Sequence, residues 1–201
     1  MATLLYGPSS PYSAKVRMAA AQIGLELDAQ VTDTNRQEPL PGLAAQNPLA
    51  KIPVLVTDAG VAVYDSRVIM QELNRMSRNA LYPRNAEKRL EAEILEALAD
   101  GICDCLLAHV YERRLRPEEK VHQPWLDKQW DKALRGLDRL NETPLRLPTK
   151  ITGGHIAVRA MLGYIALRFP GKWERGRSKL VRWGKRFDEK FPALVAYLPQ
   201  G

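Results

Sequence analysis

The pattern of apolar residues changes near residue 80, and this change limits the folds open to the chain. Up to residue 78, short alternating runs typical of strands are separated by segments with helical spacing. Beyond residue 85 the alternation stops, and apolar residues recur at helical spacing only. We therefore expect an α/β unit followed by an all-helical bundle.

The α/β unit is expected to begin with a strand, a helix and a second strand. Thr3–Tyr6 is a short β-like run, residues 12–23 follow helical spacing up to Gly24, and residues 25–31 alternate again. A right-handed crossover would make the two strands parallel.

Two further strands and a helix complete this unit. The expected segments are a Pro- and Asn-rich loop over 34–48, strands over 52–56 and 61–63 joined by a turn at 58–60, and a helix after Asp65-Ser66. The apolar face of that helix consists of Val68, Ile69, Leu73 and Met76.

The rest of the chain is predicted to form four helices after a linker. Segment 79–85 contains Pro83 and lacks a helical period, so it would join a domain over 1–78 to a helical domain over 86–201. The helices are expected over 86–115, 124–141, 152–168 and 176–190. The first has apolar residues at near four-residue steps, at Leu90, Ile94, Leu98, Ile102 and Leu106.

Composition narrows the class of protein. With 201 residues, 45% of them hydrophobic and 26% charged, and a mean hydropathy of −0.32, the chain is unlike collagen, disordered and membrane proteins. No apolar run approaches the roughly 18 residues needed to cross a bilayer. The sequence starts without a signal-peptide pattern, so we expect a cytoplasmic protein without membrane association.

The net charge of +7 comes from the last third of the chain. Residues 143–201 hold 12 basic and 3 acidic residues, a net charge of +9, whereas residues 1–78 hold 7 of each. This excess suggests a nucleic-acid or anionic-membrane surface. However, the basic residues share one helix with Leu180, Trp183 and Phe187, which favours a solvated face over a packed stripe. Nucleic-acid binding is therefore not expected.

Several common catalytic and ligand-binding motifs are absent from the sequence. It has no phosphate-binding loop, zinc-protease motif, nucleophile elbow or dinucleotide-binding glycine triplet. The three histidines, His109, His122 and His155, are too scattered for a metal site. Cys103 and Cys105 would point to different sides of a helix, which argues against a disulfide and a zinc pair. We expect reduced thiols and no metal.

Ser9-Ser10-Pro11-Tyr12 stands where the first strand meets the first helix. A serine there can cap the helix, with Pro11 in the first turn, where its missing N–H costs nothing. The same geometry places free N–H groups and the positive end of the helix dipole beside a hydroxyl, which would stabilise a bound thiolate. Both interpretations remain open from the residues alone.

Two other features accompany this junction. Pro53 interrupts a strand that otherwise looks central, so it belongs at an edge, a strand start or a cis bond. If the bond is cis, the neighbouring backbone groups can pair with an extended ligand. Asp65-Ser66 can hold an amino-acid-like zwitterion, although such a pair is more often a helix cap.

Together, these features resemble the glutathione transferase family over nearly the whole chain. The resemblance rests on Ser-Pro-Tyr followed by Lys15-Val16-Arg17, on the stretch 47–55 with its N-P-x-x-K-I-P-V-L form, and on Tyr64-Asp65-Ser66. It implies a thioredoxin-like N-terminal domain followed by an all-helical domain.

The resemblance also implies a role for each matching residue. Ser10 would hydrogen-bond the thiol of glutathione, with Ser9 as the other candidate, and Pro53 would be a cis-proline beside Ile52. Val54 would pair with the cysteinyl backbone, Lys51 would reach the glycyl carboxylate, and Asp65 and Ser66 would bind the γ-glutamyl end. The pocket for the electrophile would be formed by Tyr12, Asp104, Cys105 and His109.

The implied function is a glutathione transferase of the detoxification type, which joins a glutathione thiolate to a small hydrophobic electrophile. Glutathione is then a co-substrate, and no cofactor is expected. The alternative is a non-catalytic glutathione-transferase-like binding or regulatory protein. A thiol-disulfide reductase would need a cysteine at position 10, which this chain lacks. Isomerisation and dehalogenation by glutathione addition remain open, and a homodimer is expected from the family.

The sequence departs from the family at one position. Members usually begin the third helix of the second domain with S/T-x-x-D, a capping box, whereas this chain has Thr152-Gly153-Gly154-His155. A histidine at the positive end of the helix dipole is expected to cost a cap contact and to lower stability by roughly 1 kcal/mol.

Overall fold

The computed structural model describes residues 1–34, 38, 40–143 and 145–201, so the expected loop over 34–48 lies partly outside the described residues. The first part contains a mixed sheet with strand order β2-β1-β3-β4. Its strands are β1 (Thr3–Tyr6), β2 (Asp28–Val31), β3 (Val54–Val56) and β4 (Ala62–Val63). β1 pairs with β2 in parallel, as expected for a right-handed crossover, and with β3 in antiparallel register.

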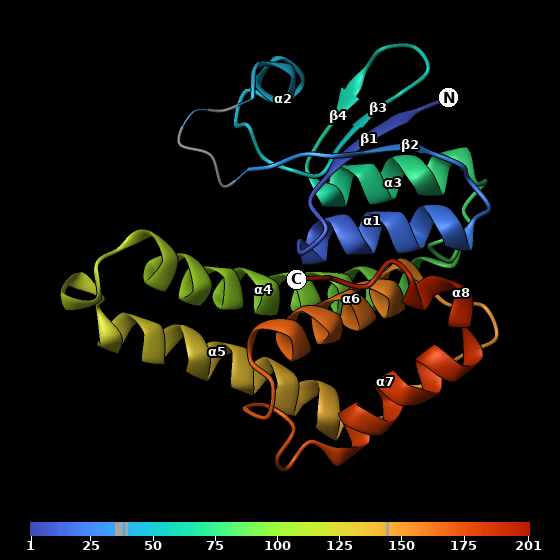
Figure 1. Cartoon of the computed structure of the whole chain (residues 1–201). Helices are drawn as coiled ribbons and strands as arrows, with labels where there is room; N and C mark the ends of the chain where they lie inside the picture. Colours follow the sequence, from blue (N-terminus) through green and yellow to red (C-terminus); the bar gives the residue numbers. More distant parts are fainter. Residues whose placement is uncertain (35–37, 39, 144) are drawn as a thin grey trace.

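Two helices cover the face of the sheet that looks toward the rest of the molecule. They are α1 (Pro11–Gln22) and α3 (Ser66–Met76), which pack against each other between the sheet and the second part (Figure 1). The short helix α2 (Pro41–Gln46) lies apart from them. It was not predicted, because its six residues bury only Leu43 and therefore show no apolar period.

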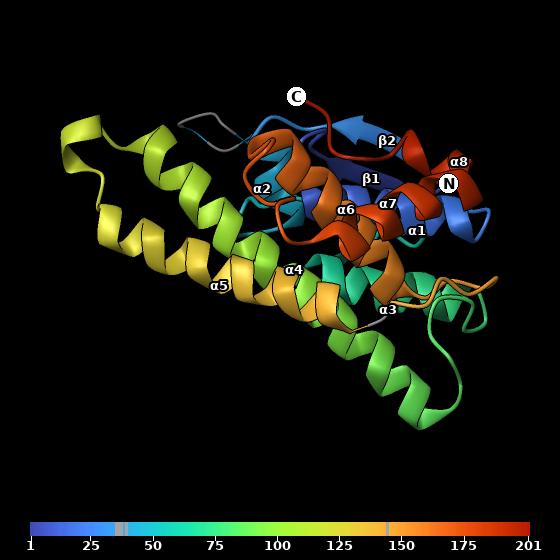
Figure 2. The same cartoon turned by 90° about the horizontal axis from the view of Figure 1, so that it is seen from below.

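The regular elements described in the second part are all helical, as expected, but two short ones occur beyond the four predicted helices. Its elements are α4 (Ala86–Leu115), the 3-10 turn η1 (Glu118–Lys120), α5 (Gln123–Glu142), α6 (Gly153–Arg168), α7 (Ser178–Lys190) and α8 (Pro192–Val195). α5 runs back alongside α4 (Figure 1 and Figure 2). α6 packs against α4 and against α1, so it joins the second part to the first.

One continuous set of buried apolar side chains connects the two parts. It extends from Leu4 and Val16 in the first part to Met161 and Trp183 in the second. The fold is therefore a thioredoxin-like α/β unit packed on a helical bundle. α3 ends at Met76 and α4 begins at Ala86, but the division into domains over 1–78 and 86–201 with a linker over 79–85 stays a prediction. No helix in the described parts of the chain is long and apolar enough to cross a bilayer.

Some apolar residues of the predicted helix faces are exposed. Ile69 and Leu73 of α3 are buried, but Val68 is 52% exposed, and on α4 the exposed fractions of Leu90 and Ile94 are 56% and 58%. The predicted apolar face of α3 is therefore only partly correct, since Met76 is also 43% exposed. Helical spacing alone does not reveal which side of a helix the neighbouring elements cover.

The basic stretch has the expected solvated face. Along α7, Leu180, Trp183 and Phe187 are buried, whereas Arg182 and Lys185 are exposed. Charged groups thus lie in water above a buried apolar stripe.

The expected loss of a cap contact at the start of α6 is wrong. The neutral ring of His155 takes the place of the usual carboxylate, because its Nδ1 accepts the Thr152 backbone N–H at 3.1 Å. Its Nε2 lies 3.0 Å from the Arg146 carbonyl oxygen, to which it donates. Burial lowers the pKa of His155, which keeps the ring neutral and its Nδ1 able to accept. A capping box therefore forms without an acid.

Candidate functional site

Ser10 is the N-cap of α1. Its Oγ accepts the backbone N–H of Ser13 at 3.2 Å, and Pro11 occupies the first turn. The capping interpretation of this serine is therefore confirmed. Among the hydrogen bonds of the described residues, none has the Ser10 hydroxyl as donor, so its proton remains available to a ligand.

The Ile52–Pro53 bond is cis, as expected, and β3 begins only at Val54. Pro53 has no N–H to offer the sheet, which explains why the strand starts later than predicted. Gly7 permits the close approach of this loop to the turn after β1, because a Cβ at Gly7 would lie 2.5 Å from Ile52 Cδ1. The buried Asn47 supports the loop by donating to the Lys51 carbonyl at 2.8 Å.

Asp65 caps α3, because its Oδ1 accepts the backbone N–H of Arg67 at 3.0 Å. The neighbouring Ser66 is 4% exposed, and the Tyr64–Asp65 bond is cis. The simple cap interpretation thus holds for Asp65 also. Among the described residues, its carboxylate accepts no other hydrogen bond.

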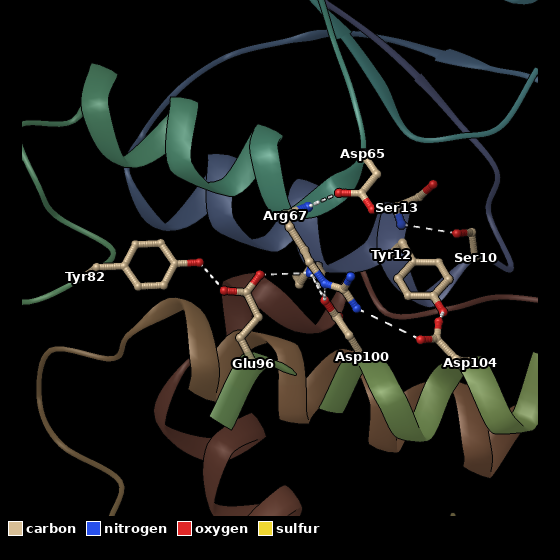
Figure 3. Close-up of polar contacts among 10 residues, drawn as sticks. Ser10, Tyr12, Ser13, Asp65, Arg67, Tyr82, Glu96, Asp100 and Asp104 are labelled. Atoms are coloured by element: carbon tan, nitrogen blue, oxygen red, sulfur yellow. Dashed lines mark hydrogen bonds and ion pairs between the residues drawn. The ribbon is translucent and has the colours of Figure 1, made fainter. Parts of the chain in front are cut away.

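A buried charge network joins α1 to α4 beneath these residues (Figure 3). Lys15 is 1% exposed, and its ammonium lies 2.9 Å from Glu96 Oε1 and 2.8 Å from Asp100 Oδ2. Burial alone would lower the pKa of Lys15, but the charges of Asp100 and Glu96 raise it above the ordinary value. Lys15 therefore stays protonated and neutralises carboxylates that could not otherwise be buried.

The network extends to the surface of a cavity. Arg67 Nε lies 3.2 Å from Asp100 Oδ2, and the Tyr12 hydroxyl donates to Asp104 (Figure 3). Burial raises the pKa of Tyr12 far above its ordinary value, with further contributions from Cys103 and Asp104, so its hydroxyl is a neutral donor at physiological pH.

The predicted site did not include Glu96, Asp100 or Arg67. The available signal was the four-residue spacing of acids on α4, at positions 96, 100 and 104, which places three carboxylates on one side of the helix. Lys15 belonged to the family motif, but nothing local indicated its partners.

These elements enclose a cavity of about 670 Å³ between the two parts. Its wall in the first part includes the predicted site residues Ser10, Lys51, Pro53, Asp65 and Ser66 and the alternative candidate Ser9. Ile52 and Tyr12 also line it, whereas Val54 is fully buried behind it. The volume lies within the usual range of small-molecule sites.

The predicted α4 wall is only partly correct. Asp104 lines the cavity together with Leu107 and Tyr111, but Cys105 and His109 are not among its described lining residues. His109 packs edge-on against Trp130 and Phe169, with ring centroids 6.0 and 5.3 Å away. The reason is helical geometry, since position 105 is turned about 100° from 104, away from the cavity and toward the other neighbours of α4.

The described residues contain no cluster of three or more His, Cys, Asp or Glu side chains that could hold a metal ion. Both cysteines are free, and burial raises the pKa of the Cys103 thiol well above its ordinary value. A buried neutral thiol is a poor nucleophile.

Comparisons with known proteins agree with this architecture. Residues 9–76 match the model of the glutathione S-transferase N-terminal domain. The GST-like protein YibF of Escherichia coli K12 is 36% identical over 148 residues, which cover 70% of this chain and 72% of YibF. The chain belongs to the glutathione S-transferase family.

Other relatives extend the comparison. The chain is 33% identical in sequence to a glutathione transferase family member from Pseudomonas fluorescens Pf-5, whose crystal structure contains bound glutathione. The structural match covers 100% of both chains, with a TM-score of 0.92. A stringent starvation protein A homologue of Coxiella burnetii is 39% identical over 72 residues, and this chain spans only 33% of its length. The similarity to the glutathione S-transferase family therefore extends over the whole fold.

Proposed function

We propose that this family member is a serine-type glutathione transferase. The observation that carries the proposal is the convergence of Ser10, Pro53 and Ser66 on one cavity whose opposite wall comes from α4. A cavity built from both parts of the fold can hold glutathione on one side and an electrophile on the other.

Glutathione fits the residues that the first part of the fold contributes to the cavity wall. Asp65 offers a carboxylate to the γ-glutamyl amino group, and Ser66, at the N-terminus of α3, offers a hydroxyl and N–H donors to its carboxylate. The backbone of Val54 would pair with the cysteinyl part, and Lys51 would meet the glycyl carboxylate. The Pseudomonas relative binds glutathione, which supports this assignment.

Ser10 would then activate the thiol without becoming covalently bonded. Its hydroxyl donates to the sulfur, and the N-terminus of α1 adds a positive potential, so both lower the thiol pKa. The thiolate attacks an electrophilic carbon held against Tyr12, Leu107 and Tyr111. The leaving group departs with the electron pair of the broken bond, and the thiol proton passes to solvent.

Isothermal titration calorimetry with glutathione is the direct test of the site. We expect saturable binding, and we expect Ser66→Ala to weaken it about tenfold through the loss of a hydrogen bond to a charged group. Ser178→Ala, at the exposed start of α7, is the matched control and should leave the affinity unchanged. Wild-type protein that fails to bind glutathione would contradict the proposal.

The alternative is a non-catalytic binding or regulatory protein, and the partial match to a stringent starvation protein A homologue is the observation in its favour. Turnover of 1-chloro-2,4-dinitrobenzene with glutathione separates the two. Binding without turnover would support the alternative, whereas turnover would support a transferase that acts in detoxification. The two free cysteines fit the reducing cytoplasm, where we propose that the protein acts.

We also propose a homodimer formed through the α3–α4 patch, which we define as the exposed Val68, Leu90 and Ile94. The helices α3 and α4 meet there, since Arg89 donates to Gln71 at 2.7 Å across them. Exposed apolar side chains grouped on one face usually mark an interface, and a two-fold dimer buries the same patch of both copies.

Sedimentation velocity at micromolar concentration tests the dimer. Ile94→Glu places a charge in the centre of the α3–α4 patch and should shift the protein from dimer to monomer. Leu115→Glu, at the exposed end of α4, is the control and should remain dimeric. A monomeric wild-type protein would rule out this interface.

A further inference from the structure

The segment that follows α8, residues 197–200, returns from the second part of the fold to the first. It passes α6, where a Cβ at Gly163 would lie 2.8 Å from Pro199 Cδ, and it reaches the turn that joins β1 to α1 (Figure 1). Pro199 is buried in this position. We call residues 197–200 the return segment. None of them is among the described lining residues of the cavity.

The return segment hydrogen-bonds the turn that carries Ser10. The backbone N–H of Gln200 donates to the Pro8 carbonyl at 3.0 Å. The turn itself is closed by the Ser10 N–H, which donates to the Gly7 carbonyl at 3.1 Å. Among the described residues, the bond from Gln200 is the only hydrogen bond that the backbone of Pro8 or Ser9 makes. The middle of the turn is therefore anchored from outside the cavity.

Arg17 joins the return segment to the elements on both sides of the turn. Its guanidinium carbon lies 4.3 Å from the centroid of the Tyr6 ring and 5.0 Å from the centroid of the Tyr197 ring. Tyr6 is the last residue of β1, Arg17 lies on α1, and Tyr197 begins the return segment. A guanidinium is attracted to the faces of both rings. The proposed function gives this arginine no role.

The position of the turn decides how the Ser10 hydroxyl meets a bound thiol. The N-cap contact fixes Ser10 relative to α1, but the proposed glutathione contacts at Pro53 and Ser66 lie on other elements. A hydrogen bond weakens steeply when its distance and angle depart from the preferred values. A displacement of about 1 Å in a reactive site can therefore cost a large factor in rate.

We propose that the return segment holds the turn in the position that lets Ser10 activate the thiol. The backbone N–H of Gln200 and the side chain of Arg17 are then positioning groups, which act through Ser10 and do not touch the substrate. The inference rests on the proposed transferase function, and it adds a contact outside the cavity to the groups that set the pKa of the bound thiol.

Replacing Gln200 by proline removes the N–H, whereas Gln200→Ala keeps it and is the matched control. Ultraviolet difference absorption of the glutathione-saturated protein, followed against pH, measures the pKa of the bound thiol. The wild-type value should lie below the value of about 8.5 for a free thiol. Gln200→Pro should raise it by about 0.5 to 1 and lower kcat about threefold to tenfold at a pH below it, because less thiolate forms. Gln200→Ala should match the wild type.

The binding of glutathione separates positioning from a loss of the site. Below the pKa of the bound thiol, calorimetric affinity for glutathione should stay within about twofold in Gln200→Pro, since the groups assigned to the peptide are unchanged. In a Ser10→Ala background, Gln200→Pro should cause no further change in the bound-thiol pKa, because two changes that act through one group are not additive.

A second variant displaces the return segment without changing its sequence. Gly163→Ala places a methyl group against the rigid ring of Pro199 and should raise the bound-thiol pKa in the same direction as Gln200→Pro. Gly184→Ala on α7 is its control, because a Cβ there meets only Leu162 Cδ1 at an ordinary 3.5 Å. Thermal unfolding checks that each variant is folded.

Substitution of Arg17 tests the aromatic contacts. Arg17→Met removes the cation and should raise the bound-thiol pKa, whereas Arg17→Lys should restore part of the effect because an ammonium is also attracted to the rings. Arg175→Met, which changes an exposed arginine outside the cavity wall, should have no effect.

The failure of this inference differs from the failure of the proposed function. If the wild type lowers the thiol pKa and folded Gln200→Pro and Gly163→Ala leave it unchanged, the return segment does not position Ser10, and the transferase proposal stands. Equal shifts in Gln200→Pro and Gln200→Ala, or a loss of thermal stability without a pKa shift, would overturn the inference also. If the wild type does not bind glutathione or does not lower its thiol pKa, the proposed thiol activation fails, and the positioning role fails with it.

Discussion

Replacing Ser10 by alanine is expected to lower kcat/KM for glutathione and 1-chloro-2,4-dinitrobenzene about 10-fold to 100-fold. The variant removes the hydroxyl that caps α1 by accepting the Ser13 N–H and that lines the cavity. A hydrogen bond to a charged group contributes about 1.5–3 kcal/mol, which corresponds to this range of rates. Steady-state kinetics at pH 6.5 measures the effect under conditions where the free thiol is mostly protonated.

The pH dependence distinguishes thiol activation from a structural effect. Ser10 is proposed to lower the pKa of the bound thiol, so its contribution is largest below the pKa of a free thiol, about 8.5. Above that pH the thiolate forms without help, and the deficit of Ser10→Ala should shrink. A deficit that is constant from pH 6.5 to pH 9.5 would contradict the assigned role.

Two further variants control for the lost helix cap. Ser10→Ala removes the acceptor for the Ser13 N–H and should cost about 1 kcal/mol of stability. Ser10→Thr retains both the cap and the hydroxyl, so it should recover most of the activity. Ser9→Ala, in the neighbouring position on the cavity wall, should be nearly neutral. If Ser9→Ala is the damaging change, Ser9 is the thiol-activating residue.

The regular elements could be predicted because their apolar periods are long or clearly bounded. The helix expected over 86–115 has the same first and last residues as α4. Asn85 caps its start by accepting the Lys88 N–H at 3.0 Å, and the apolar spacing repeats over many helical turns. α2 was missed because six residues with one buried side chain carry no such period.

The site was predictable where a motif fixes it locally, and less so where tertiary contacts decide. Ser10, Pro53 and Ser66 stand at element junctions, so their place in the cavity follows from the order of strands and helices. Cys105 and His109 were assigned by proximity along α4, but a helix with neighbours on several sides presents a different face to each. Tyr164 and Arg168 likewise reach the cavity only because α6 lies beside α4, which no local pattern records.

Replacing Lys15 by methionine is expected to lower the free energy of unfolding by about 3–5 kcal/mol at pH 7. The side chain is 1% exposed, and its removal would leave the buried carboxylate of Glu96 without a cation and that of Asp100 with Arg67 alone. Because Lys15 lies on α1 and the two acids lie on α4, the loss would loosen the contact between the two parts of the fold. Urea unfolding followed by circular dichroism measures it.

Matched variants test whether an unpaired charge is the cause. Lys88→Met removes an exposed lysine from the first turn of α4 and should change stability by less than about 0.5 kcal/mol. Adding Glu96→Gln and Asp100→Asn to Lys15→Met removes the stranded charges and should recover part of the loss, because neutral amides cost less to bury. A triple variant as unstable as or less stable than Lys15→Met would point to packing instead.

The pH dependence of the single variant gives an independent check with a definite sign. Burial raises the pKa of Asp100 even with Lys15 present, and removal of the cation would raise it further. A carboxyl group whose pKa is higher in the folded than in the unfolded state stabilises the fold at low pH, and this contribution is lost as the pH rises through the folded pKa. The stability gap between wild type and Lys15→Met should therefore narrow from pH 7 toward pH 5. A gap that is unchanged or wider at pH 5 would show that the buried carboxylates do not govern the loss.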